Sequence, residues 1–126
     1  MKGKTVVVLQ SNYIPWKGYF DLINIADEFI FHDDLQYTEQ EWRNRNLIKT
    51  PNGVKWLSIP VGISQKKMIC EVETKGNEWK ERHRKKIEGA YAGAKFFKAF
   101  EYILDELYDN DISGLSQYNP HVIKYL

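Results

Sequence analysis

The sequence predicts an α/β protein with a Rossmann-like βαβ unit at the N-terminus, a β-hairpin insertion and two to three C-terminal helices. Three observations predict this fold. Two β-branched or aromatic runs flank a helical pattern within the first 32 residues. An Asn-Gly pair at residues 52–53 separates two extended segments. Beyond residue 77, apolar residues recur at helical spacing.

The N-terminal unit has the order strand, loop, helix, strand. Thr5–Leu9 is a continuous β-branched run, which is typical of a strand buried on both faces of a parallel sheet. After the polar loop Gln10–Pro15, apolar residues in 16–26 recur at helical spacing, and Glu28–His32 reads as a second buried strand. Two strands joined by a helix within one sheet run parallel with a right-handed crossover.

The next segment is predicted to form a β-hairpin. Trp42–Thr50 and Val54–Val61 flank the turn Pro51–Gly53, whose Asn-Gly pair supplies the positive φ values of a tight turn. Met68–Val72 is a candidate for a further short strand.

The last 50 residues are predicted to be helical. Trp79 and His83 share the apolar face of a helix that starts at Asn77, so His83 is expected to be buried and hydrogen-bonded. The apolar residues of Phe96–Leu107 predict a second amphipathic helix. Pro120 predicts a kink or a restart in the final helical segment.

Composition narrows the class of protein. A chain of 126 residues with a net charge of +1 is one globular domain without bulk attraction to nucleic acid. Cys70 is the only cysteine, so an intramolecular disulfide is excluded and a reducing cytoplasm is expected. No apolar run reaches the roughly 20 residues of a membrane helix, so no membrane insertion is expected. The sequence identifies neither a metal site nor a cofactor.

Two loops leave the carboxyl ends of the predicted parallel strands, where ligands bind in open α/β sheets. Gln10–Trp16 leads into a helix N-terminus, which favours a phosphate or carboxylate. In the second loop, Asp33 and Asp34 either shape a turn or cap, or one of them binds a sugar hydroxyl, holds a metal or acts as a general base. His32 is either an ordinary strand residue or a group for proton transfer.

The segment Trp42–Asn46 is unusual for a strand. As a strand, it would place Arg43 and Arg45 on one face and Asn44 and Asn46 on the other, leaving no apolar face. Either these residues pair with the acidic stretch 21–42, or the arginines bind phosphate or carboxylate while the asparagines bind sugar hydroxyls.

Five ordered blocks resemble the WbqC-like protein family. They are Leu9–Phe20, His32–Tyr37, Trp42–Asn46, Lys49–Gly53 and Trp56–Val61. The resemblance continues to the C-terminus as a pattern of helices. Ser11 and Asn12 depart from the usual Gln-Pro-x-Tyr-x-Pro form of the first block.

The resemblance implies a role in bacterial O-antigen or surface-polysaccharide biosynthesis, as a transferase that adds glycine or another amino acid to a sugar or nucleotide-sugar. It also implies that 1–126 is a single WbqC-like domain that is incomplete at its C-terminus, because family members are usually longer. The expected catalytic residues are His32, Asp33 and Asp34, and the expected substrate-binding residues are Gln10, Tyr13, Trp16, Lys17, Tyr19, Tyr37, Arg43, Asn44, Arg45 and Asn46.

Two other readings stay open. The protein is alternatively a non-catalytic ligand-binding or assembly module, or a truncated, inactive family member. A second copy of the chain is a further partner that the sequence leaves open.

Overall fold

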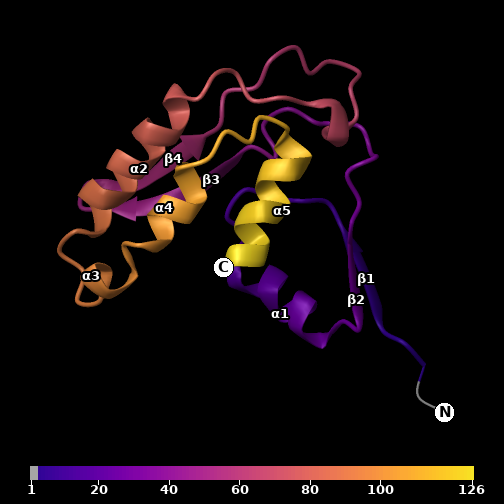
Figure 1. Cartoon of the computed structure of the whole chain (residues 1–126), viewed down its shortest axis with the longest axis horizontal. Helices are drawn as coiled ribbons and strands as arrows, with labels where there is room; N and C mark the ends of the chain where they lie inside the picture. Colours follow the sequence, from indigo (N-terminus) through magenta and orange to yellow (C-terminus); the bar gives the residue numbers. More distant parts are fainter. Residues whose placement is uncertain (1–2) are drawn as a thin grey trace.

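The computed structural model describes residues 3–126, and Figure 1 shows their arrangement. The elements are β1 Val6–Leu9, α1 Lys17–Ile25, β2 Glu28–Phe31, β3 Arg45–Thr50, β4 Gly53–Ser58, η1 Ile69–Glu71, α2 Glu78–Tyr91, α3 Phe97–Phe100, α4 Ile103–Tyr108 and α5 Leu115–Tyr125. Within the described residues, no helix is long and apolar enough to cross a membrane.

The predicted α/β fold class is confirmed. β1 and β2 pair in parallel, with Val6 opposite Glu28 and Leu9 opposite Phe31, and α1 forms the connection between them. β3 and β4 form the predicted antiparallel hairpin, and the helices follow it along the chain. The βαβ unit therefore brings the ends of β1 and β2 to one edge of the sheet.

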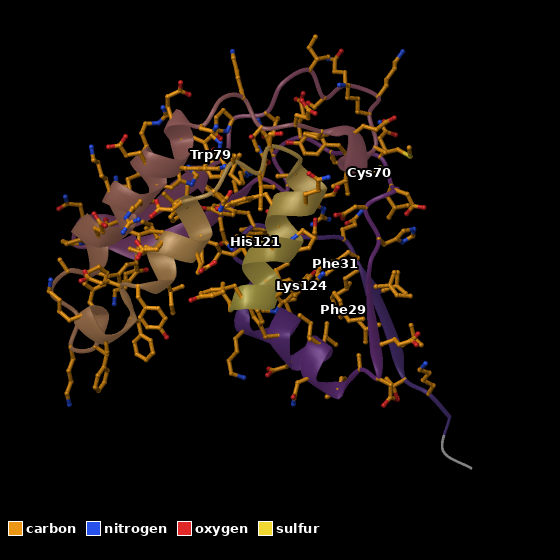
Figure 2. All side chains as sticks on the ribbon, in the orientation of Figure 1. Phe29, Phe31, Cys70, Trp79, His121 and Lys124 are labelled. Atoms are coloured by element: carbon orange, nitrogen blue, oxygen red, sulfur yellow. The ribbon has the colours of Figure 1, made fainter. Side chains whose placement is uncertain are left out.

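The prediction that these two strands are buried on both faces is wrong. Phe29 points from β2 toward the side of α1 (Figure 2), and its ring centroid lies 5.4 Å from that of Tyr19 on α1. The opposite face stays open because the sheet has two strands and α1 covers one side of it. The apolar residues left nearly half exposed on that face are Val6, Val8 and Ile30.

The hairpin turns at the predicted Asn-Gly pair, where Gly53 has a φ of 99°. Its strands are shorter than predicted. β3 begins at Arg45 rather than at Trp42, whose carbonyl oxygen instead accepts a hydrogen bond from the amide of Tyr13 at 3.1 Å. β4 ends at Ser58, two residues before a proline that cannot donate to a strand ladder.

The predicted strand Met68–Val72 is wrong, because residues 69–71 form the single 3-10 turn η1. The carboxylate of Glu71 accepts a hydrogen bond from the amide of Met68 at 2.8 Å and closes this turn. Met68 forms only an isolated bridge with Gln36.

The predicted helix over Phe96–Leu107 is divided into α3 and α4. The apolar residues would share one face of a continuous helix, but the chain turns at residues 101–102 and separates the two helices. The break lets Leu104 and Leu107 enter the core, while Phe96 and Phe100 remain more than half exposed.

Of the two alternatives predicted at Pro120, a kink or a restart, the restart does not occur, since α5 continues through this residue. Neighbouring side chains hold the helix in place. The amide of Asn119 donates to the carbonyl of Arg43 at 2.7 Å, and the hydroxyl of Tyr118 donates to the carbonyl of Leu107 at 2.7 Å.

The core lies among α2, α4, α5 and the inner face of the hairpin. Trp79, Tyr13, Tyr118 and Leu57 are fully buried there. The predicted burial and hydrogen bonding of His83 are confirmed, because it is 3% exposed and both its ring nitrogens have partners.

Candidate functional site

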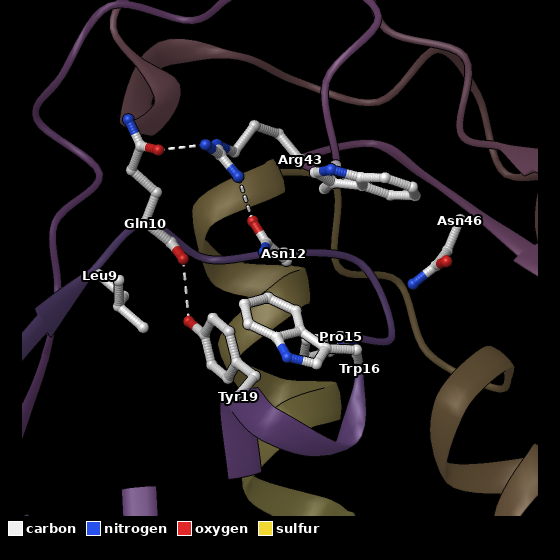
Figure 3. Close-up of a pocket in the computed structure, with 9 residues that line it drawn as sticks. Leu9, Gln10, Asn12, Pro15, Trp16, Tyr19, Arg43 and Asn46 are labelled. Atoms are coloured by element: carbon white, nitrogen blue, oxygen red, sulfur yellow. Dashed lines mark hydrogen bonds between the residues drawn. The ribbon is translucent and has the colours of Figure 1, made fainter. Parts of the chain in front are cut away.

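A pocket of about 480 Å³ opens between the end of β1, the start of α1 and the segment before β3 (Figure 3). This volume lies in the range of small-molecule sites. Three aromatic residues, four polar or charged residues and two apolar residues line it. They are Trp16, Tyr19 and Trp42; Gln10, Asn12, Arg43 and Asn46; and Leu9 and Pro15.

Trp16 and Tyr19 form an aromatic wall of the pocket. Their ring centroids are 5.6 Å apart in an edge-to-face arrangement, and Trp16 is 57% exposed. Gly18 permits this arrangement, because a Cβ atom at that position would overlap Nε1 of Trp16. Trp16 is also the N-cap residue of α1, and its side chain does not cap the helix. The first turn of α1 thus begins at the pocket with its end uncapped by that side chain.

Arg43 supplies the positive charge of the pocket. Its guanidinium donates hydrogen bonds to the side-chain oxygens of Asn12 and Gln10, both of which are neutral (Figure 3). No carboxylate of residues 3–126 forms a salt bridge with it. Burial lowers the pKa of Arg43, yet an arginine stays charged in proteins. The pocket therefore holds an oriented cation whose charge is not neutralised by direct contact.

Hydrogen bonds from Tyr19 and Asn46 hold the loop 10–16 next to Arg43. The hydroxyl of Tyr19 donates to the carbonyl of Gln10 at 2.8 Å, and burial raises the pKa of Tyr19, so its hydroxyl keeps its proton. Ile14 has a φ of 44°, which is unusual for a β-branched residue. The amide of Asn46 donates to the carbonyls of Ile14 and Tyr13 and holds the chain in this conformation. Backbone strain of this kind is concentrated at binding and catalytic sites.

Asp33 accepts hydrogen bonds from Ser11 in the same loop. Its Oδ1 accepts a hydrogen bond from the amide of Ser11 at 2.8 Å, and its Oδ2 accepts one from the hydroxyl of Ser11 at 2.6 Å. Both residues are buried. Both carboxylate oxygens of Asp33 are thus engaged in joining the ends of β1 and β2.

We expect Asp33→Ala to lower the free energy of unfolding by about 2–3 kcal/mol, because two donors of Ser11 become buried without partners. Urea denaturation measures this loss. Asp34→Ala is the matched control, since the Asp34 side chain is 73% exposed, and it should change stability by less than about 0.5 kcal/mol. Equal stabilities of the two variants would contradict the role given to Asp33.

His32 and Asp34 form a separate pair. His32 Nε2 lies 3.1 Å from Asp34 Oδ1, and both side chains are substantially exposed. The amide of His32 donates to the carbonyl of Leu9 at 2.7 Å, which ties the pair to a residue of the pocket rim. Neither side chain is among those that line the pocket.

The structure brings together five of the ten expected substrate-binding residues and separates the others from the pocket. Tyr13 and Tyr37 lie in the core with exposures of 0% and 5%. Lys17 extends into solvent and pairs with Asp21 at 2.9 Å. The residues that line the pocket are Gln10, Trp16, Tyr19, Arg43 and Asn46.

The two arginines of the Trp42–Asn46 segment lie in different surroundings. Arg45 lies with its guanidinium carbon 4.1 Å from the ring centroid of Trp56 and donates to the carbonyl of Gln40. The amide of Asn44 donates to the carbonyl of Ile59 at 2.9 Å. Because β3 starts at Arg45, Arg43 is free of the strand alternation and turns into the pocket.

Sequence reasoning did not include four residues that line the pocket: Leu9, Asn12, Pro15 and Trp42. Asn12 could have been found, because it is polar and lies in the loop that leaves β1. Trp42 adjoins the predicted arginine segment, but nothing in the local pattern indicates that its ring faces loop 10–16. Among residues 3–126, no group of three or more His, Cys, Asp or Glu side chains is placed to hold a metal ion.

The fold and the pocket define a mixed α/β protein with a Rossmann-like βαβ unit and a pocket at the end of its first strand. The sequence of residues 10–126 matches the profile of the WbqC-like protein family, and the chain belongs to this family.

A relative from Mycobacterium tuberculosis, the uncharacterized protein Rv1507c, is 44% identical to this chain over 123 residues. The match covers 95% of the chain and 53% of the relative, so the chain spans about half the length of that relative. No solved structure matches the chain significantly.

Proposed function

We propose that the pocket binds an anionic sugar or nucleotide-sugar, and that the protein acts as a transferase in bacterial O-antigen or surface-polysaccharide biosynthesis. The single observation that carries the binding proposal is Arg43, a half-buried cation oriented by two neutral amide oxygens and free of a salt bridge within residues 3–126. A phosphate or carboxylate would supply the missing negative charge.

The rest of the lining suits the remainder of such a ligand. Exposed rings of Trp16 and Trp42 offer apolar faces to a sugar or a base, and the amides of Gln10, Asn12 and Asn46 supply donors and acceptors for hydroxyl groups. The start of α1 adds a favourable dipole for an anion. The free thiol of Cys70 agrees with a reducing cytoplasm as the location.

The proposed reaction transfers glycine or another amino acid from an activated donor to the sugar. An amine or hydroxyl of the acceptor attacks the activated carboxyl carbon, and an amide or ester bond forms. The donor's leaving group departs with the electron pair of the broken bond, and the acceptor's proton passes to a base. His32 is the candidate base, because Asp34 orients its ring and its backbone adjoins Leu9 at the pocket rim.

We expect Arg43→Gln to weaken binding of a nucleotide-sugar by about tenfold to a hundredfold, the usual range for loss of a charge-assisted hydrogen bond. Isothermal titration calorimetry with uridine- and guanosine-diphosphate sugars measures the dissociation constants. Glutamine keeps an amide near Asn12 and Gln10, so the change removes charge more than shape.

Arg45→Gln is the control for this experiment, because it makes the same substitution two residues away and outside the pocket lining. It should keep the wild-type affinity within about threefold. Equal affinities of Arg43→Gln and Arg45→Gln for the nucleotide-sugars would contradict the proposal that the pocket binds them.

One observation favours the second candidate, a non-catalytic binding module. None of the nine residues that line the pocket is an Asp, Glu, His or Cys. An assay of labelled glycine incorporation into the bound sugar distinguishes the two functions. Turnover that His32→Gln abolishes supports the transferase, and ligand binding without turnover supports the module.

A further inference from the structure

The outer face of the β3–β4 hairpin carries apolar side chains that remain 40–63% exposed. Residues paired directly across an antiparallel ladder share a face, so Leu47 and Trp56 lie side by side, as do Lys49 and Val54. Leu47 is 40% exposed, Trp56 is 41% exposed and Val54 is 63% exposed. In contrast, Leu57 on the inner face is fully buried.

The hairpin presents this face away from the helices. Figure 1 shows α2 and α4 on one side of β3 and β4, where the contacts between α2 and β3 are made. Trp42 extends the outer face, since its ring centroid is 5.7 Å from that of Trp56 and it is 44% exposed. The outer face therefore consists of an aromatic pair followed by aliphatic residues toward the turn.

The charged side chains on the outer face of the two strands are cationic, while Glu39 and Glu41 come just before Trp42 in the sequence. Arg45 lies against Trp56, and Lys49 follows on the same face. Charge disfavours a second copy of the chain on this face, because a twofold contact about its centre brings these cations toward each other.

We propose that the outer face of the hairpin docks the protein on the surface of an anionic lipid bilayer. Leu47 and Val54 would enter the boundary between headgroups and acyl chains, and Trp42 and Trp56 would lie at headgroup level, where tryptophan is enriched. Arg45 and Lys49 would contact lipid phosphates. Side chains of Leu and Val offer no hydrogen bonds to a sugar or nucleic acid, so the bilayer matches both the apolar and the cationic parts of the face.

The test is co-sedimentation of the 126-residue protein with vesicles of phosphatidylglycerol and phosphatidylcholine. We expect binding that weakens at high salt and is at least tenfold weaker with phosphatidylcholine alone. Phosphatidylcholine brominated on its acyl chains, included in the anionic vesicles, should quench the fluorescence of the exposed tryptophans.

Val54→Asp and Lys49→Gln should each reduce partitioning about fivefold or more. Ile63→Asp is the matched control for Val54→Asp, because Ile63 is 83% exposed, lies outside the hairpin and receives the same charge. It should retain most of the binding. Circular dichroism confirms that each variant is folded.

Three results would overturn the proposal. They are failure of the folded wild-type protein to bind anionic vesicles, equal losses for Val54→Asp and Ile63→Asp, and a dimer in light scattering that Val54→Asp converts to a monomer. The last result would assign the face to a second copy of the chain. The substituted residues Lys49, Val54 and Ile63 lie outside the pocket lining, so the effects of these variants on vesicle binding are separate from the test of the proposed function.

Discussion

Trp79→Ala should lower the free energy of unfolding by about 3–5 kcal/mol, the usual cost of removing a large buried aromatic side chain. Trp79 is fully buried, and its ring centroid lies 5.1 Å from those of His83 and Tyr118. The indole also meets Tyr13 edge to face, so its removal opens a cavity where α2, α5 and loop 10–16 meet. A small domain has only about 5–15 kcal/mol of stability, so much of it would be lost.

Urea denaturation followed by circular dichroism measures this effect. Trp56→Ala is the matched control, because Trp56 is 41% exposed and its removal loses mainly the contacts with Arg45 and Trp42, at a cost of about 1 kcal/mol. Trp79→Phe should cost clearly less than Trp79→Ala, since Nε1 of Trp79 has no hydrogen-bond partner among the described residues. Similar losses for the alanine variants of Trp79 and Trp56 would contradict the central place of Trp79.

The second large effect is a loss of stability in acid that depends on His83. The carbonyl of Ser58 can only accept a hydrogen bond, so His83 Nε2, 3.0 Å away, carries the proton. Nδ1 then accepts a hydrogen bond from the hydroxyl of Tyr13 at 2.8 Å, and that hydroxyl also contacts Tyr108. The network fits a neutral imidazole.

Burial lowers the pKa of His83 from 6.5 to about 4, and Lys86 and Arg82 act in the same direction against the opposing hydrogen bond to Ser58. The unfolded chain therefore binds more protons than the folded chain between these two values. The stabilisation is fully present above pH 6.5 and falls away as the pH drops to about 4, by about 3 kcal/mol in total.

We expect the free energy of unfolding to fall by about 2 kcal/mol from pH 7 to pH 5 through this group alone. His83→Gln should be less stable at pH 7 but should lose this part of the pH dependence. His121→Gln is the control, because it removes the same residue type from a surface contact with the carbonyl of Glu106. Equal flattening of the pH profile by both variants would contradict the assignment to His83.

Local sequence patterns predicted the βαβ unit and the hairpin turn, because both depend on interactions between residues close together in the sequence. The β-branched run of β1 and the helical spacing in α1 predicted the βαβ unit, because both signals lie within neighbouring residues. The Asn-Gly pair predicted the hairpin turn, since it sets positive φ values locally. The division of the helix over 96–107 was not predicted, because its apolar spacing is that of one continuous helix.

The sequence predicted where the candidate site lies, but only some of the residues that line it. The loop that leaves β1 contributes Gln10 and Trp16 to the pocket, as the general geometry of parallel strands indicates. Tyr13 belongs to the same loop, yet it turns into the core and contacts His83. Sequence position alone cannot distinguish these directions, because they are set by contacts with residues 70 positions away.

The sequence by itself determined the strand–helix–strand order at the N-terminus, the parallel pairing of β1 with β2, and the turn at Gly53. Only the tertiary structure decided that Asp33 binds Ser11 and that Arg43 enters the pocket while Arg45 stacks on Trp56. The physical reason is distance along the chain. Periodicity and turn chemistry act over a few residues, whereas the surroundings of a charge are supplied by segments that only folding brings together.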